Sequence, residues 1–228
     1  MKKQTQTDRL NNNSAYQSMA LYGQQLKTRF YINPDNFLDW VYANHKWVQY
    51  NPRKQINRYG LSITSLNGGV DGIPDLDSLR EYNQENETNY NEKDFKTRTP
   101  VAEYPELKNI LDEFGDSVFR SHLLRLDPGG FFPPHRDHKE PFIDSFRLIV
   151  PLQYTNAPYF NFVIDGKITN WDSGFVYFAD TTKEHYLFNG GGNPSYWIIL
   201  NIENNVKNKN SFLIIVFFSS TISRKLSH

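Results

Sequence analysis

Short apolar runs separated by turn residues make up most of the chain after Ser117. They are rich in aromatic and β-branched residues, as is typical of strands. The runs are SVFRSHLLRL, SFRLIVPLQY, YFNFVI, KITNW, FVYFAD, EHYLF and YWIILNI. Asp165 and Gly166 separate YFNFVI from KITNW, and an Asp-Gly pair between two such runs predicts a two-residue hairpin turn. The pattern predicts an antiparallel barrel or jelly roll.

The first half of the chain predicts two helices, one strand and long irregular segments. The segment from Pro34 to Asn44 has proline in its first turn and apolar side chains on one face. The segment from Pro105 to Phe114 has apolar residues at helical i, i+3, i+4, i+7 spacing, and Gly115 follows it where a left-handed cap is expected. We expect a strand from Arg58 to Thr64 and loops or a lid in the polar stretch from Asp75 to Thr99. The predicted fold class is mainly β with flanking helices.

The length of 228 residues corresponds to one domain with additions at both ends. We expect a disordered N-terminus over residues 1–20, an α/β elaboration with loops covering a pocket over 21–116, a jelly-roll core over 117–203 and a C-terminal tail over 204–228. The tail contains the apolar run FLIIVFF, from Phe212 to Phe218, which is too short to span a bilayer as a helix. It predicts a terminal strand or an exposed apolar tail.

Composition and charge narrow the function classes. The 25 basic residues balance 25 acidic ones, so no overall charge attracts nucleic acid or an anionic membrane, and we expect neither as a partner. The chain has no cysteine, which excludes disulfides, thiolate zinc sites and cysteine nucleophiles. Its first residues lack the apolar stretch of a secretory signal, and we expect a cytoplasmic protein. Any metal must be held by nitrogen and oxygen.

Two histidines and two acidic residues lie close together in DPGGFFPPHRDHKE, from Asp127 to Glu140. His135 and Asp137 are two apart, so in an extended segment both side chains point to the same side. His185 heads a later apolar run, and a jelly roll can bring it to the first pair. Two histidines and one carboxylate leave three positions open on an octahedral ion, an arrangement typical of non-haem Fe(II) oxygenases.

Other interpretations of these histidines stay open. A His-x-Asp pair also occurs where the side chains are merely solvated or hydrogen-bonded. His138 is the main competing ligand, but its odd spacing from His135 and Asp137 turns it to the other side. His122 shares strand parity with Leu124, which would place it inside the barrel.

The stretch from His122 to Ile202 resembles the aspartyl/asparaginyl β-hydroxylase family of Fe(II)/2-oxoglutarate oxygenases, including its bacterial proline hydroxylase-like members. The features that carry the resemblance are four blocks in order: LLRLDPGG, PHRD, FRLIVPL and FVYFADTTKEHYLFN. The resemblance implies a double-stranded β-helix, a jelly roll like that of the cupins, which binds Fe(II) and decarboxylates 2-oxoglutarate oxidatively. It does not extend to the N-terminal hundred residues.

The resemblance also implies roles for single residues. His135, Asp137 and His185 match the metal ligands and catalytic centre, and Arg147 matches an arginine that binds the carboxylate of the cosubstrate. A guanidinium can grip a carboxylate through two parallel hydrogen bonds. Asn189 matches an asparagine that is common after the second histidine and could contact cosubstrate or substrate, although an asparagine that starts a glycine-rich turn needs no function.

One position departs from the family pattern. Ser195 stands where relatives usually have a second arginine, and it is followed by Tyr196. Three possibilities follow: Arg147 anchors the cosubstrate with help from these two hydroxyls, another strand supplies the anchor, or cosubstrate binding has been lost.

The expected function is hydroxylation of an amino acid or a peptidyl side chain, of the Asp, Asn or Pro type, with O2 and a small molecule or peptide as partners. Arg58, Asn67 and the loop from Asp71 to Asp77 are candidates for substrate contact, although residues of a polar loop are often only solvated. The alternatives are a cupin-like binding protein without turnover, and a zinc or manganese enzyme on the same barrel that does not use 2-oxoglutarate.

Overall fold

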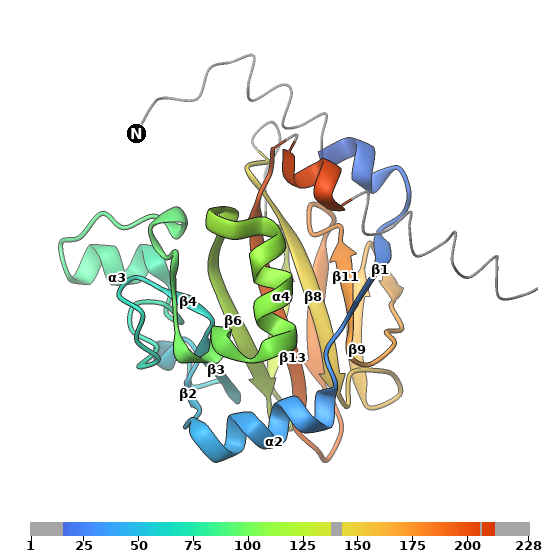
Figure 1. Ribbon diagram of the computed structural model, residues 1–228. Helices are drawn as coiled ribbons and strands as arrows, with labels where there is room; N and C mark the ends of the chain where they lie inside the picture. The colour runs from blue at the N-terminus through green and yellow to red at the C-terminus, as the bar shows by residue number, and fades with distance from the viewer. Residues whose placement is uncertain (1–15, 138–142, 206, 213–228) are drawn as a thin grey trace, which may run out of the picture.

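The computed structural model describes residues 16–137, 143–205 and 207–212. Within these ranges two antiparallel sheets pack on each other, and helices cover the outer face of the larger sheet (Figure 1). The strands are β1 (Gln25–Tyr31), β2 (Val48–Gln49), β3 (Arg58–Ser62), β4 (Thr64–Ser65), β5 (Thr97–Arg98), β6 (Val118–Leu126), β7 (Phe131–His135), β8 (Ser145–Gln153), β9 (Phe160–Ile164), β10 (Lys167–Ile168), β11 (Phe175–Ala179), β12 (His185–Asn189) and β13 (Ser195–Glu203). The helices labelled in Figure 1 are α2 (Pro34–Asn44), α3 (Leu79–Glu85) and α4 (Pro105–Phe114), and there are short 3-10 turns η1 (Pro52–Lys54), η2 (Glu92–Asp94), η3 (Pro100–Glu103) and η4 (Gly115–Ser117).

The larger sheet has seven strands in the order β1-β11-β8-β13-β6-β3-β2, and the smaller has four in the order β10-β9-β12-β7. β4 and β5 form a separate pair. Neighbours in the sheets are often far apart in the sequence: β8 lies between β11 and β13, and β12 lies between β9 and β7. The fold class, antiparallel and mainly β with flanking helices, is confirmed.

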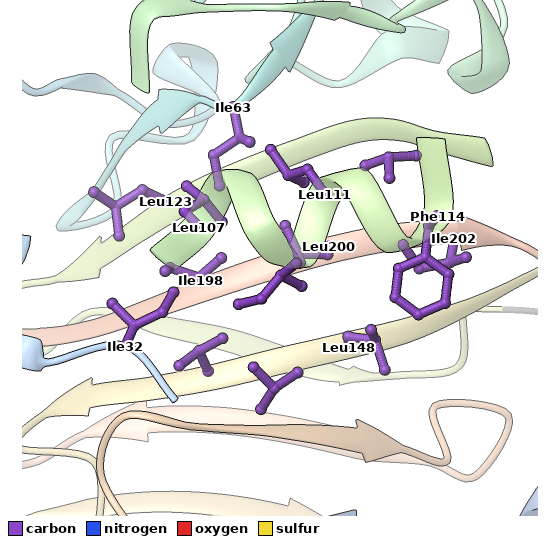
Figure 2. Packing of buried hydrophobic residues seen from close by; sticks show 14 of the residues in the cluster. Ile32, Ile63, Leu107, Leu111, Phe114, Leu123, Leu148, Ile198, Leu200 and Ile202 are labelled. Atoms are coloured by element: carbon purple, nitrogen blue, oxygen red, sulfur yellow. The ribbon is translucent and has the colours of Figure 1, made fainter. Parts of the chain in front are cut away.

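Two hydrophobic cores lie on the two faces of the larger sheet. The outer core packs helices α2 and α4 on the sheet. Figure 2 shows the side chains of α4 above those of β8 and β13. The members of the outer core include Leu107, Leu111, Phe114, Leu148, Leu200 and Ile202. The inner core lies between the two sheets and includes Leu124, Ile149, Phe162, Leu187, Trp197 and Ile199. Alternation along each strand separates the two sets, since successive side chains of a strand point to opposite faces.

Several local predictions are confirmed. Helices α2 and α4 have the predicted bounds. Gly115 ends α4 with a positive φ of 53°, but its ψ of −130° lies outside the left-handed region that the sequence predicted for this cap. Asp165 and Gly166 form the two-residue turn between β9 and β10, both with positive φ, as a hairpin of this type requires. The predicted strand from Arg58 is interrupted at Ile63 and becomes β3 and β4.

The predictions for the two ends are wrong where the structure describes them. Residues 16–20 are helical, not disordered, because Tyr16 is buried and its hydroxyl donates to Asp180 Oδ1 at 2.8 Å. Residues 207–212 are also helical, and Phe212 is buried against Phe146 and Phe178, so it belongs neither to a strand nor to an exposed tail. Residues 1–15 and 213–228, including the rest of the apolar run, lie outside the described residues.

The N-terminal region does more than cover the core. Three of its strands, β1, β3 and β2, pair into the seven-stranded sheet at its two sides. The boundary expected near residue 117, between the N-terminal elaboration and the core, therefore does not coincide with a boundary between sheets. Over residues 16–137, 143–205 and 207–212, no helix has the length and apolar character needed to cross a membrane.

The outer core gives a stability prediction. Leu200 is fully buried beneath α4, whereas Leu21 is 85% exposed. Leu200→Ala should lower the free energy of unfolding by about 2–5 kcal/mol through lost burial and the cavity left behind. Leu21→Ala should change it by less than about 0.5 kcal/mol. Urea denaturation followed by tryptophan fluorescence measures both, and equal effects would contradict the assigned packing.

Candidate metal centre

Three side chains from two distant segments of the sequence converge where the smaller sheet ends. His135 is the last residue of β7 and His185 the first of β12, and the antiparallel register places them directly opposite each other. Asp137 follows β7, and its backbone N–H donates to the carbonyl of Thr181 at 3.1 Å, which fixes it beside the pair. One ligand atom from each of the three side chains lies within 4.8 Å of the other two. The sequence prediction had singled out the same three residues.

Hydrogen bonds orient both imidazoles. The Nδ1 atom of His135 lies 2.7 Å from the Pro133 carbonyl, and that of His185 lies 3.0 Å from the Lys183 carbonyl. A carbonyl oxygen only accepts, so Nδ1 carries a proton in each ring, and Nε2 has a free lone pair when the ring is neutral. The two Nε2 atoms lie 3.5 and 3.8 Å from Asp137 Oδ1. The donors therefore point toward a common centre, with the outer ring nitrogens held as in many metal sites.

The charges at the site keep Asp137 ionised. Burial opposes its charge, but the Arg147 guanidinium and the two imidazoles outweigh burial and hold the pKa of Asp137 well below its usual range. Burial lowers the pKa of His185. At His135 burial also disfavours the charged ring, but hydrogen bonds to Asp137 and the Pro133 carbonyl raise its pKa overall. The centre thus offers a permanent carboxylate and, near neutral pH, at least one neutral imidazole.

A cavity of about 110 Å³ adjoins the three side chains, between the two sheets. Its wall is largely apolar, with a few polar groups among the following residues: Tyr50, His122, Leu124, Phe132, Arg147, Ile149, Phe162, Thr181, Leu187 and Ile199. The Thr181 hydroxyl is buried without a hydrogen-bond partner among the described residues. An apolar wall with a few convergent polar groups is typical of a small-ligand site.

Arg147 lies in this cavity wall, as its strand parity with Ile149 requires. Its Nε donates to Asp137 Oδ2 in a short ion pair. The structure gives its two terminal nitrogens no hydrogen-bond partner within the described residues.

Ser195 and Asn189, for which the sequence predicts contact with a cosubstrate, are not among the residues that line this cavity. The Ser195 hydroxyl is fully buried and accepts a hydrogen bond from the Trp197 indole at 2.8 Å. The Asn189 amide donates to the carbonyls of Leu126 and Asn193, which ties a glycine-rich turn to the sheet. Both side chains are occupied in holding the fold.

The hydroxyl of Tyr196 is also directed elsewhere, since it pairs with that of Tyr42 at 2.7 Å in the outer core. His138 lies outside the described residues. His122 lines the cavity, in agreement with its strand parity.

Sequence reasoning missed much of the cavity wall, including Tyr50, Phe132 and Thr181. Tyr50 lies in a polar, irregular segment without periodicity, so no local signal marks it. Phe132 and His135 both face the cavity despite their odd spacing, because the register between β7 and β12 shifts between them. The two prolines between them, which suit an irregular strand edge, could have indicated such a bulge. Thr181, at the end of a β run, had no distinguishing feature.

Comparison with protein families identifies the relationship. The model of the aspartyl/asparaginyl β-hydroxylase family matches residues 78–205, more than half of the chain. The chain belongs to this family. The match contains all the site residues predicted from the resemblance, but Tyr50 and Arg58 precede it. No curated protein sequence matches this β-hydroxylase family member.

Several solved structures are similar to this chain at low identity. An oxidoreductase of the 2OG-Fe(II) oxygenase family from Burkholderia pseudomallei is 11% identical, with 89% of this chain and 94% of that chain covered and a TM-score of 0.46. KdgF from Halomonas sp. is 10% identical, with coverage of 76% and 92% and a TM-score of 0.35. A predicted oxalate decarboxylase from Thermotoga maritima is 19% identical, with coverage of 41% and 73% and a TM-score of 0.31. These likenesses carry no information about the substrate or cofactor of this β-hydroxylase family member.

The converging donors predict metal binding. His185→Ala should weaken Co(II) binding by more than about 100-fold, since losing even a hydrogen-bond partner of a ligand costs 10- to 100-fold. His45→Ala removes a histidine at the end of α2, away from the centre, and should leave the affinity unchanged. Calorimetric titration of the metal-free protein measures both, and equal affinities in the two variants would refute the site.

His122 gives a prediction for pH. Burial, with help from Arg147 and Arg120, lowers the pKa of His122 to about 3 in the folded protein. The unfolded chain binds a proton there near pH 6.5. Acidification from pH 6.5 toward 3 therefore favours unfolding, by up to about 1.4 kcal/mol per pH unit.

The free energy of unfolding should consequently depend less steeply on pH in His122→Phe than in the wild type between pH 4 and 6. Chemical denaturation at several pH values measures this slope. At pH 7 His122 is neutral in both the folded and the unfolded state, so the difference in free energy of unfolding between the two proteins gives the effect of the substitution itself. Parallel pH profiles would show that His122 titrates normally in the folded protein.

Proposed function

We propose that the protein is an Fe(II)/2-oxoglutarate-dependent oxygenase that hydroxylates an amino acid or a peptidyl side chain and releases succinate and CO2. The observation that carries the proposal is the convergence of His135, Asp137 and His185 beside a cavity, with both Nε2 atoms directed toward Asp137. Two imidazoles and one carboxylate on one side of an ion leave room for a chelating cosubstrate and oxygen. Membership in the β-hydroxylase family supports the same reaction class.

The residues present fit Fe(II). Imidazole and carboxylate donors suit this ion, and the chain has no cysteine to favour a softer one. When bound, iron would supply the oxygen chemistry in which substrate, O2 and 2-oxoglutarate give hydroxylated substrate, succinate and CO2. The protein's contribution is to orient the donors, to exclude bulk water from the apolar cavity and to place one C–H bond near the metal.

Arg147 is the anchor that we assign to the cosubstrate. Its terminal nitrogens lack partners within the described residues and face the cavity, so they can donate two parallel hydrogen bonds to a carboxylate. The contact with Asp137 fixes the guanidinium plane and leaves this pair of donors available. The unpaired Thr181 hydroxyl can add one further hydrogen bond in the place of the arginine absent at position 195.

The first experiment is an anaerobic titration with 2-oxoglutarate of the protein loaded with Fe(II). We expect a saturable visible charge-transfer band in the wild type and its loss in His185→Ala. Arg147→Gln should weaken 2-oxoglutarate binding by about 10- to 100-fold, since hydrogen bonds to charged groups contribute 1.5–3 kcal/mol. Arg29→Gln, which removes an exposed charge on β1, is the matched control and should behave as the wild type.

If iron is demonstrably bound but the charge-transfer band never appears, 2-oxoglutarate is excluded as the cosubstrate. The function would then be that of a cupin-like binding protein or of an enzyme using zinc or manganese. Ser195, buried where relatives carry an arginine, is the feature that favours this second outcome.

A further inference from the structure

Arg58 is a buried cation without a counter-ion among the residues that the structure describes. It is the first residue of β3 and only 5% exposed. Within the described residues its guanidinium makes no hydrogen bond or ion pair, and its Nε atom is buried with no partner. Buried charges in proteins are normally paired, because removing an ion from water is costly. Burial accordingly lowers the pKa of Arg58.

Two aromatic rings connect Arg58 with the candidate metal centre. Its guanidinium carbon lies 4.3 Å from the centre of the Phe132 ring and 5.5 Å from that of Tyr50. Both rings also line the metal cavity, and Phe132 lies 6.5 Å from the His135 ring. Stacking on Phe132 holds the guanidinium plane but leaves its N–H groups free, since these point out along the edge of that plane.

The space outside these rings is a pocket of about 410 Å³, lined by Arg58, Tyr50, Phe132 and His135 among others. It therefore shares three residues with the metal cavity and adjoins it. The segment from Asp77 to Arg80, which belongs to the polar stretch expected to form loops or a lid, also borders it. A molecule in this pocket would contact Arg58 and the metal centre together.

The acidic residues of this pocket already have partners. Asp77 forms an ion pair with Arg53, and Glu92 forms one with Arg120 at 2.6 Å. Neither is paired with Arg58. The pocket thus holds a preformed cation, oriented by aromatic rings, whose donors no side chain in the described residues uses.

We propose that Arg58 binds the α-carboxylate of the substrate, so that the protein acts on a free amino acid rather than on a residue inside a peptide. The proposal deepens the proposed function, on which it rests for the reaction itself. Arg147 lies beside Asp137 in the inner cavity, whereas Arg58 lies beyond the Phe132 ring. The two arginines are placed to hold two different carboxylates, that of the cosubstrate inside and that of the substrate outside.

The test is a binding measurement that needs no turnover. The twenty standard L-amino acids are titrated calorimetrically into the anaerobic protein, with and without Fe(II) and 2-oxoglutarate, and each ligand that binds is compared with its α-carboxamide. We expect at least one amino acid to bind and its amide to bind at least about tenfold more weakly, because the amide has no charge to pair with Arg58. Absence of binding by all twenty would overturn the proposal.

Substitutions then locate the contact. Arg58→Gln should weaken binding of that amino acid by about 10- to 100-fold and abolish the preference for acid over amide. Arg58→Lys should recover part of the affinity, because it keeps the charge but loses the planar fork. Arg80→Gln removes an exposed arginine at the rim of the pocket and should change the affinity by less than about threefold, which controls for a general charge effect.

Two further measurements separate this proposal from its rivals. Arg58→Gln should unfold at the same urea concentration as the wild type or a higher one, since it removes a buried charge that has no partner among the described residues. Marked destabilisation would show that Arg58 is structural. The 2-oxoglutarate band should be unchanged in Arg58→Gln, and a weakened band would reassign Arg58 to the cosubstrate. Amino-acid binding through Arg58 without any band in the wild type would refute the oxygenase and leave the carboxylate site standing.

Discussion

The candidate site depends on the pairing of β7 with β12. Antiparallel register sets His185 opposite His135, and a slip of one residue would turn either ring to the other face of the sheet. The bulge in the same pairing brings Phe132 to the cavity side as well. One irregular pairing of two short strands thus places two metal donors and the ring that supports Arg58.

Local features of the fold could be predicted from the sequence because they are encoded in adjacent residues. Proline at the start of α2, the apolar spacing of α4 and the Asp165-Gly166 turn each act over a few positions. The metal triad could be predicted partly from the i, i+2 spacing and partly from a family resemblance. Tyr50 and the direction of Ser195 could not, because they depend on how distant strands pack. The burial of Tyr16 depends likewise on Asp180, far along the chain.

The ion pair between Arg147 and Asp137 allows a buried carboxylate at the centre to stay ionised. A buried carboxylate tends to take up a proton, and a protonated acid is a poor metal ligand. The guanidinium supplies the opposite charge at contact distance and keeps Asp137 ionised while it is shielded from solvent. The same contact orients the arginine toward the cavity, so one ion pair prepares both the carboxylate that we propose for the metal and the guanidinium that we propose for the cosubstrate.

The two arginines near the cavity differ in whether their charge is balanced. Arg147 has a carboxylate of its own, and its pKa is raised despite burial. Arg58 has no carboxylate partner in the described part of the chain, and its pKa is lowered. An unbalanced buried charge reduces the stability of a fold. Aromatic stacking offsets only part of this cost, because a ring face accepts none of the guanidinium hydrogen bonds. The Arg58 guanidinium can stay buried without a protein partner if a ligand supplies the anion. Part of the binding energy would then come from pairing a charge whose burial destabilises the free protein.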